Sequence, residues 1–185
     1  MVPSPQGSDA SRPAHAAEER RPTSLLLVYV WDMVLAVLAL FGALAAFGGG
    51  VEEHGRTVTL SLPVQLLQAF SSGALAASLI VIGTLLTRQH AWVRRAQIAI
   101  LAMTAALGLT SLLADQVTAG DGLQLGPLLG SLLFALLDVA AIVAMTGARL
   151  TAWHRRGGSV PLYLGGLVAF WAATSVALAG LRLAA

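Results

Sequence analysis

Cysteine and lysine are both missing from this 185-residue chain. Without a thiol, the protein cannot form a disulfide, a thiolate metal site or a thiol nucleophile. Without a lysine amine, it cannot hold retinal or pyridoxal phosphate as a Schiff base. All 11 basic residues are arginines. A coding bias towards Ala, Leu, Gly and Arg explains the missing lysine as well as any function does.

Charged residues are also scarce. They make up 11% of the chain, against about 25% in a typical soluble domain. Hydrophobic residues make up 57%, and the mean hydropathy is +0.78. The formal net charge of +2 is small, and the arginines lie beside apolar runs. These features predict an integral protein of the cell membrane, in contact with the lipid bilayer, and no binding to nucleic acid.

No recognisable catalytic or cofactor motif is present in the sequence. There is no HExxH, GxSxG or P-loop sequence, and no glycine-rich dinucleotide fingerprint after a strand. Histidines fall only in the predicted tail or loops, which excludes haem ligation by two histidines inside the bundle. Glu52, Glu53 and His54 are adjacent on a loop, and such neighbours seldom converge on one metal ion. We therefore expect no enzyme activity, catalytic residue, metal site or cofactor.

Five apolar stretches are each long enough to cross a bilayer, which takes about 20 residues in a helix. The sequence predicts an all-α integral membrane bundle of five transmembrane helices. A strand-like alternation after the first span, TVTLSL, predicts a short hairpin. Residues 1–23, rich in proline and small residues, predict a disordered cytoplasmic tail. The transmembrane domain takes residues 24–185, with spans at about 24–47, 63–86, 96–113, 126–147 and 160–181.

The loops predict the orientation of the bundle. Arginines cluster before the first span, between the second and third, and between the fourth and fifth, at Arg20, Arg21, Arg88, Arg94, Arg95, Arg149, Arg155 and Arg156. The other two loops hold most of the loop carboxylates. Because cytoplasmic loops carry an excess of arginine, we expect the N-terminus inside and the C-terminus outside.

The fourth apolar stretch carries one carboxylate, Asp138, near its middle. An aspartate at a helix centre costs about 2.5–3.5 kcal/mol on insertion, and the many leucines of this span offset that cost. Ser131, Ala135 and Asp138 share one helix face. Gly126 and Gly130 are spaced for close helix packing. We expect this helix to be central in the bundle, with Asp138 turned towards other helices.

Further polar residues accompany Asp138 as a candidate intramembrane site. Asp32 lies about a third of the way into the first span, where it either snorkels to the headgroups or is a buried partner within the bundle. Gln65, Gln68 and Ser72 form a stripe on one face of the second span. This stripe either lines an aqueous vestibule or bonds in the headgroup region and across helices. Catalysis by paired aspartates needs Asp32 and Asp138 at one depth, which the spacing allows.

Two further patterns indicate contacts with partners. Gly165, Ala169, Ala173 and Ala177 form a seam of small residues along the last span, which favours helix packing. The stretches AWVRR and AWHRR end two predicted inner turns, and they indicate either an internal duplication or the ordinary preference of Trp and Arg for the interface. They supply candidate contacts to headgroups or a partner at Trp92, Arg94, Arg95, Trp153, Arg155 and Arg156.

Three functions agree with this layout. The leading one is a non-enzymatic accessory or assembly subunit that packs against other membrane proteins or against itself. The alternative is a small transporter or channel in which Asp138 binds a proton or cation. A chain this short has no room for two large repeated halves, so a transporter would be oligomeric. The third is a lipid-binding or lipid-modifying protein that uses the two Trp–Arg turns.

Overall fold

The computed structural model describes residues 22–48, 51–53, 56–58, 61–118 and 125–184. Within these ranges, the side chains of residues 51–53, 56–58, 114–118, 127 and 182–184 are not described. The predicted tail lies outside the described residues except for Pro22 and Thr23. Arg20, Arg21 and His54 also lie outside them.

Five long helices form the body of the protein. They are α2 (Thr23–Ala45), α3 (Leu62–Leu85), α4 (Ala91–Thr118), α5 (Leu125–Thr146) and α7 (Leu162–Ala184), and a short helix, α6 (Ala148–Trp153), precedes α7. Each of the five is long and apolar enough to cross a membrane. The prediction of a helical bundle with five helices long and apolar enough to span a membrane is therefore confirmed. The largest difference is at α4, which begins at Ala91 rather than at 96, so that Trp92, Arg94 and Arg95 belong to a helix and not to a loop.

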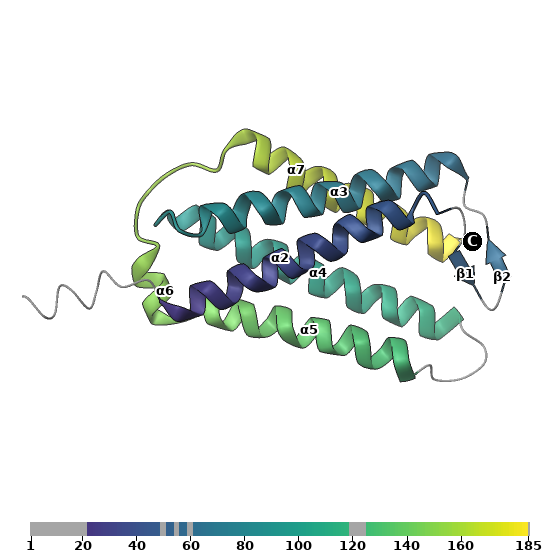
Figure 1. Cartoon of the computed structure of the whole chain (residues 1–185), viewed down its shortest axis with the longest axis horizontal. Coiled ribbons are helices and arrows are strands. Elements are labelled where there is room, and N and C mark those ends of the chain that lie inside the picture. The colour runs from purple at the N-terminus through teal and green to yellow at the C-terminus, as the bar shows by residue number, and fades with distance from the viewer. Residues whose placement is uncertain (1–21, 49–50, 54–55, 59–60, 119–124, 185) are drawn as a thin grey trace, which may run out of the picture.

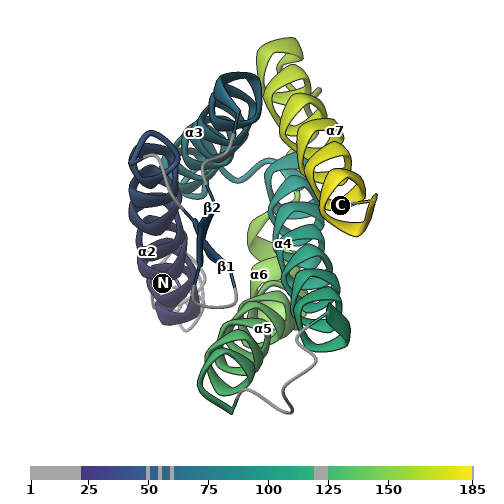
Figure 2. The ribbon, with the colours of Figure 1, turned by 90° about the vertical axis from the view of Figure 1, so that its right-hand side faces the viewer.

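Seen end-on, the five long helices form a ring (Figure 2). Each packs against two neighbours, in the order α2, α3, α7, α4, α5 and back to α2, and α4 also touches α3. The predicted central position of α5 is wrong. Leu129, Leu133 and Leu136 on its outer side are 56–66% exposed. Small residues do not require a central position, because a leucine-rich helix is equally stable with one face on lipid.

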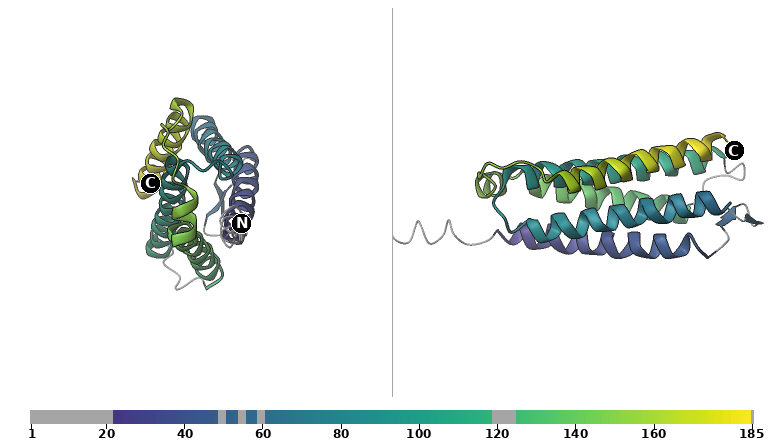
Figure 3. Two further views of the ribbon diagram at one scale, coloured as in Figure 1. Left: turned by 90° about the vertical axis from the view of Figure 1, so that its left-hand side faces the viewer. Right: turned by 90° about the horizontal axis from the view of Figure 1, so that it is seen from above.

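The two ends of the ring differ in their connections. At one end, strands β1 (Val51–Glu53) and β2 (Arg56–Val58) pair antiparallel, which confirms the predicted hairpin. We call this the hairpin end. The links from α3 to α4 and from α5 through α6 to α7 lie at the other end, which we call the arginine end (Figure 1). The described chain starts at the arginine end and finishes at the hairpin end (Figure 3).

The links at the arginine end are joined by backbone hydrogen bonds. The Ala91 amide donates to the Arg156 carbonyl at 2.9 Å, and the Arg156 amide donates to the Gln89 carbonyl at 2.9 Å. The His90 ring stacks on Trp92, and its Nδ1 lies 3.0 Å from the Gly157 carbonyl oxygen. The two Trp–Arg turns are therefore neighbours in space.

The largest fully buried apolar side chains gather in the arginine-end half of the ring. They come from the first halves of α2, α4 and α7, the last halves of α3 and α5, and from α6. They include Val28, Ile82, Leu86, Val93, Leu101, Met145, Leu150 and Leu164. We call this group the apolar layer. It forms the hydrophobic core of this half of the ring.

Candidate functional site

Asp138 projects from α5 into the ring and is 3% exposed. Both of its carboxylate oxygens accept hydrogen bonds. Trp31 Nε1 of α2 donates to Oδ1 at 2.8 Å, and Thr104 Oγ1 of α4 donates to Oδ2 at 3.0 Å. The Trp31 ring also packs on Phe134 with ring centroids 5.7 Å apart. The side chain thus faces other helices, as the sequence predicts, and it links α5 to both neighbours.

The Thr104 hydroxyl lies within hydrogen-bond distance of three acceptors. Its hydroxyl lies 3.0 Å from Asp138 Oδ2, 3.1 Å from the Ile100 carbonyl oxygen and 2.9 Å from that of Leu101. A hydroxyl carries a single proton, so it donates to only one of them at a time. Rotation of this hydroxyl is enough to release Asp138 Oδ2 without moving the helix.

Asp32 is wholly buried on α2, beside Trp31 in the sequence. Its Oδ1 accepts a hydrogen bond from Gln97 Nε2 of α4 at 2.5 Å, and Gln97 is also 0% exposed. Of the two interpretations of Asp32, the buried partner is the one that the structure supports. Gln97 is a member of the site that was not predicted, although a glutamine inside an apolar span is the signal that would have found it.

These side chains form one polar layer across the middle of the ring. We define it as Trp31, Asp32, Gln97, Thr104 and Asp138, from α2, α4 and α5. The two carboxylates lie within electrostatic range of one another. Each has its own donors, and the described residues contain no hydrogen bond between the two.

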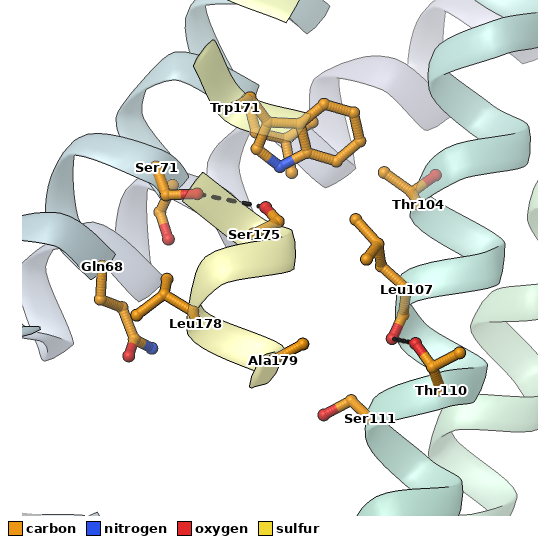
Figure 4. A pocket seen from close by; sticks show the side chains of 12 residues that line it. Gln68, Ser71, Thr104, Leu107, Thr110, Ser111, Trp171, Ser175, Leu178 and Ala179 are labelled. Carbon is orange, nitrogen blue, oxygen red and sulfur yellow. Dashed lines mark hydrogen bonds between the residues drawn. The ribbon is translucent and has the colours of Figure 1, made fainter. Parts of the chain in front are cut away.

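A cavity of about 380 Å³ lies between α3, α4 and α7, towards the hairpin end. Most of its lining surface is apolar, although seven of the twelve lining residues carry a hydroxyl or amide group, and none of the twelve is charged. Figure 4 shows Trp171 and Thr104 towards one end of it and Gln68 and Ser111 towards the other. Its lining residues are Gln68, Ser71, Ser72, Leu75, Thr104, Leu107, Thr110, Ser111, Trp171, Ser175, Leu178 and Ala179.

The cavity meets the polar layer at Thr104. This residue both lines the cavity and donates to Asp138. Gln68 and Ser72 of the predicted stripe are in the lining, which is the vestibule interpretation of that stripe, whereas Gln65 is half-buried on α3 outside it. Ser71 and Ser175 connect α3 to α7 through their hydroxyls at 3.2 Å. The Thr104 side chain therefore connects the cavity to the intramembrane carboxylate of Asp138.

The Trp–Arg turns lie at the arginine end, away from this site. Arg94 Nη1 donates to Thr151 Oγ1 at 2.6 Å and to the Met145 carbonyl oxygen at 3.3 Å, so it holds α4 to α5 and α6. Trp92 and Trp153 are half-buried. Arg95, Arg155 and Arg156 are exposed, and contact with headgroups or a partner stays a prediction for these three.

The predicted helix-packing residues lie at the surface of α5 and α7, where Gly165 and Ala169 line a groove beside α4. Gly126, Gly165, Ala169, Ala173 and Ala177 are exposed, and Gly130 is half-buried. A Cβ atom built on Gly126, Gly130 or Gly165 would meet nothing within 4 Å. These residues therefore do not pack the long helices of this chain against one another. Their packing against a second protein stays a prediction.

Comparison with known proteins adds no relative. No protein-family profile, curated protein or solved structure matches the chain. The features that bear on function are therefore the polar layer, the cavity and the exposed faces of the ring.

Proposed function

We propose that the protein is a small transporter or channel of the cell membrane, in which the polar layer around Asp138 binds a proton or small cation. The observation that carries this proposal is the position of Thr104, which lines the cavity and donates to Asp138. Ionisable residues inside a membrane are costly and commonly mark ion or proton pathways. The cavity reaches the hydroxyl that donates to this carboxylate, and several of its lining residues carry hydroxyl or amide groups.

The apolar layer supports the same proposal. The apolar layer overlaps the polar layer at Leu101, between Gln97 and Thr104 on α4, and continues from there towards the arginine end. Apolar constrictions of this kind stop ions by excluding water. Access from one side only is what a gated channel or an alternating-access transporter needs in one of its states. The reaction at the site is binding and release, without covalent chemistry.

Flux measurements with Asp138→Asn test the proposal. The purified protein in lipid vesicles is assayed for proton, sodium and potassium flux. Asparagine keeps the Oδ1 acceptor for Trp31 and removes the charge, so we expect flux to fall to the level of protein-free vesicles. Thr84→Val is the control, because the Thr84 hydroxyl bonds only to its own helix, at the Val81 carbonyl. Equal flux in wild type and Asp138→Asn would refute the proposal.

An accessory or assembly subunit is the second candidate, and a different observation favours it. Gly165, Ala169, Ala173 and Ala177 run along α7 and are all exposed, so this seam is open to another transmembrane helix. Small residues at such positions allow two helix backbones to approach closely. The composition of the native particle after gentle detergent extraction separates the candidates. An unrelated protein in fixed ratio supports the accessory subunit, and a homo-oligomer or monomer supports transport.

A further inference from the structure

The Asp32–Gln97 pair leaves two polar atoms without partners. Gln97 Nε2 donates to Asp32 Oδ1 at 2.5 Å. The other oxygens, Asp32 Oδ2 and Gln97 Oε1, are buried and have no hydrogen-bond partner within the described part of the chain. Most buried polar side-chain atoms are paired, so each exception needs an explanation.

Counting donors and acceptors shows what is missing. An ionised carboxylate accepts only, and the amide oxygen of glutamine accepts only. The two leftover oxygens therefore cannot satisfy one another. Exchanging the amide oxygen and nitrogen of Gln97 does not help, because it places the amide oxygen against Asp32 Oδ1 and leaves the numbers of donors and acceptors unchanged.

A proton added to Asp32 would give both unpaired oxygens a hydrogen-bond partner. A proton on Asp32 Oδ2 turns that oxygen into a donor, and Gln97 Oε1 is the unpaired acceptor on the side chain already bonded to Asp32. The result is a carboxylic acid and an amide joined by two hydrogen bonds. The same proton removes a charge from an interior where an unpaired ion is strongly disfavoured.

A metal cation fits the pair less well. Hard cations such as Ca²⁺ or Mg²⁺ take about six or more oxygen ligands, and the pair supplies two. The described residues contain no group of three or more His, Cys, Asp or Glu side chains able to hold a metal ion. The charged group that acts on Asp32 is Asp138 of α5, which carries the same sign when ionised and offers no compensation.

We propose that the Asp32–Gln97 pair is a proton-binding site, in which Asp32 Oδ2 carries the proton and donates it to Gln97 Oε1. The inference deepens the proposed function, because a proton held in the polar layer makes H⁺ the candidate for the transported or coupling ion. The role of H⁺ as the transported or coupling ion depends on the proposed function. The bound proton itself rests on the two unpaired oxygens.

Infrared spectroscopy of the full-length protein in lipid vesicles at neutral pH tests the inference. We expect a carbonyl stretching band of a protonated carboxyl group in the wild type. It should disappear in Asp32→Asn and persist when Glu52 and Glu53, on the hairpin outside the ring, are both changed to Gln. Gln97→Leu should retain the band but shift it, because the acid loses its partner.

Absence of the band from the wild-type protein would overturn the inference, and this result needs no variant. A band that persists unchanged in Asp32→Asn would also overturn it, because the proton would then belong to another carboxyl group. A band assigned to Asp32 in a protein with no flux of any ion leaves the proton site standing and refutes the proposed function. The two proposals therefore fail separately.

Discussion

Individual residues of the polar layer differ in how far the sequence predicts them. Asp32 and Asp138 are visible at once, because a carboxylate is rare inside an apolar span. Their partners Trp31, Thr104 and Gln97 are not predicted, although all three lie inside or beside predicted spans. A tryptophan near a helix start resembles an interface anchor, and a threonine resembles a small packing residue. Only the rotation of each helix about its axis shows which of them face the carboxylates.

Thr104 is the residue where the cavity and the carboxylate meet, so its hydroxyl should matter more than its volume. We expect Thr104→Val to reduce ion flux about 10-fold or more, since a hydrogen bond to a charged group contributes about 1.5–3 kcal/mol and about 1.4 kcal/mol is a factor of 10. The matched control is again Thr84→Val. Flux equal to that of the control would show that the hydroxyl takes no part in the pathway.

Secondary structure elements were predicted well where the apolar pattern is continuous, and poorly at the arginine end. The bounds of α2, α3, α5 and α7 differ from the predicted spans by a few residues. The early start of α4 and the short helix α6 were missed, because both carry interfacial Trp and Arg that resemble loop residues. What makes these segments helical is tertiary: Arg94 bonds across to Thr151, and Leu150 is buried in the apolar layer.

The position of α5 shows a second limit of sequence reasoning at this scale. Small-residue spacing marks a face to which a neighbour can come close. It does not say whether that neighbour belongs to the same chain. Gly126, at the start of α5, is exposed and meets no helix of the ring. The same pattern therefore led to a wrong position for the helix and to a correct direction for Asp138.

The packing of α6 against the rest of the bundle should become less stable at acid pH. His154 follows α6, is 3% exposed, and its Nδ1 lies 3.0 Å from the Leu150 carbonyl oxygen. Burial lowers the pKa of His154 below its ordinary value of 6.5; the nearby charge of Arg94 adds to this, and the Leu150 and Leu86 backbones oppose it. The folded state therefore holds the proton less tightly than the unfolded state.

The stability that comes from neutral His154 is present above about pH 6.5 and is lost as the pH falls below it. We expect the melting temperature of the wild type to fall more between about pH 7.5 and about pH 5 than that of His154→Leu. The difference should be about 2–4 °C for each kcal/mol involved. Thermal unfolding in detergent measures it, and equal slopes in the two proteins would contradict this role.

The outer faces of the helices are not covered by other helices of the described chain. Contacts at these faces determine whether the protein binds another subunit. If the α7 seam binds another subunit, Ala173→Leu should separate the chain from its native particle, because a leucine blocks close backbone approach. Val37→Leu, at a position on α2 that is 49% exposed, is the matched control. The mass and composition of the extracted particle provide the measurement. A particle unchanged by Ala173→Leu would exclude the seam as an interface.

The order of helices around the ring also divides the molecule into two parts. Contacts are extensive between α2 and α3, α3 and α7, and α4 and α5, and slighter where α5 meets α2 and where α4 meets α7. The Trp31–Asp138 and Asp32–Gln97 bonds both cross from one part to the other, and the cavity has walls in both. The polar layer therefore supplies two side-chain hydrogen bonds between these parts. Any relative motion that separates α2 from α4 and α5 at this level must undo both bonds. In the proposed function, an ion that displaces Trp31 from Asp138 breaks one of the two bonds between the parts, whereas the Thr104–Asp138 bond joins α4 to α5 within one part.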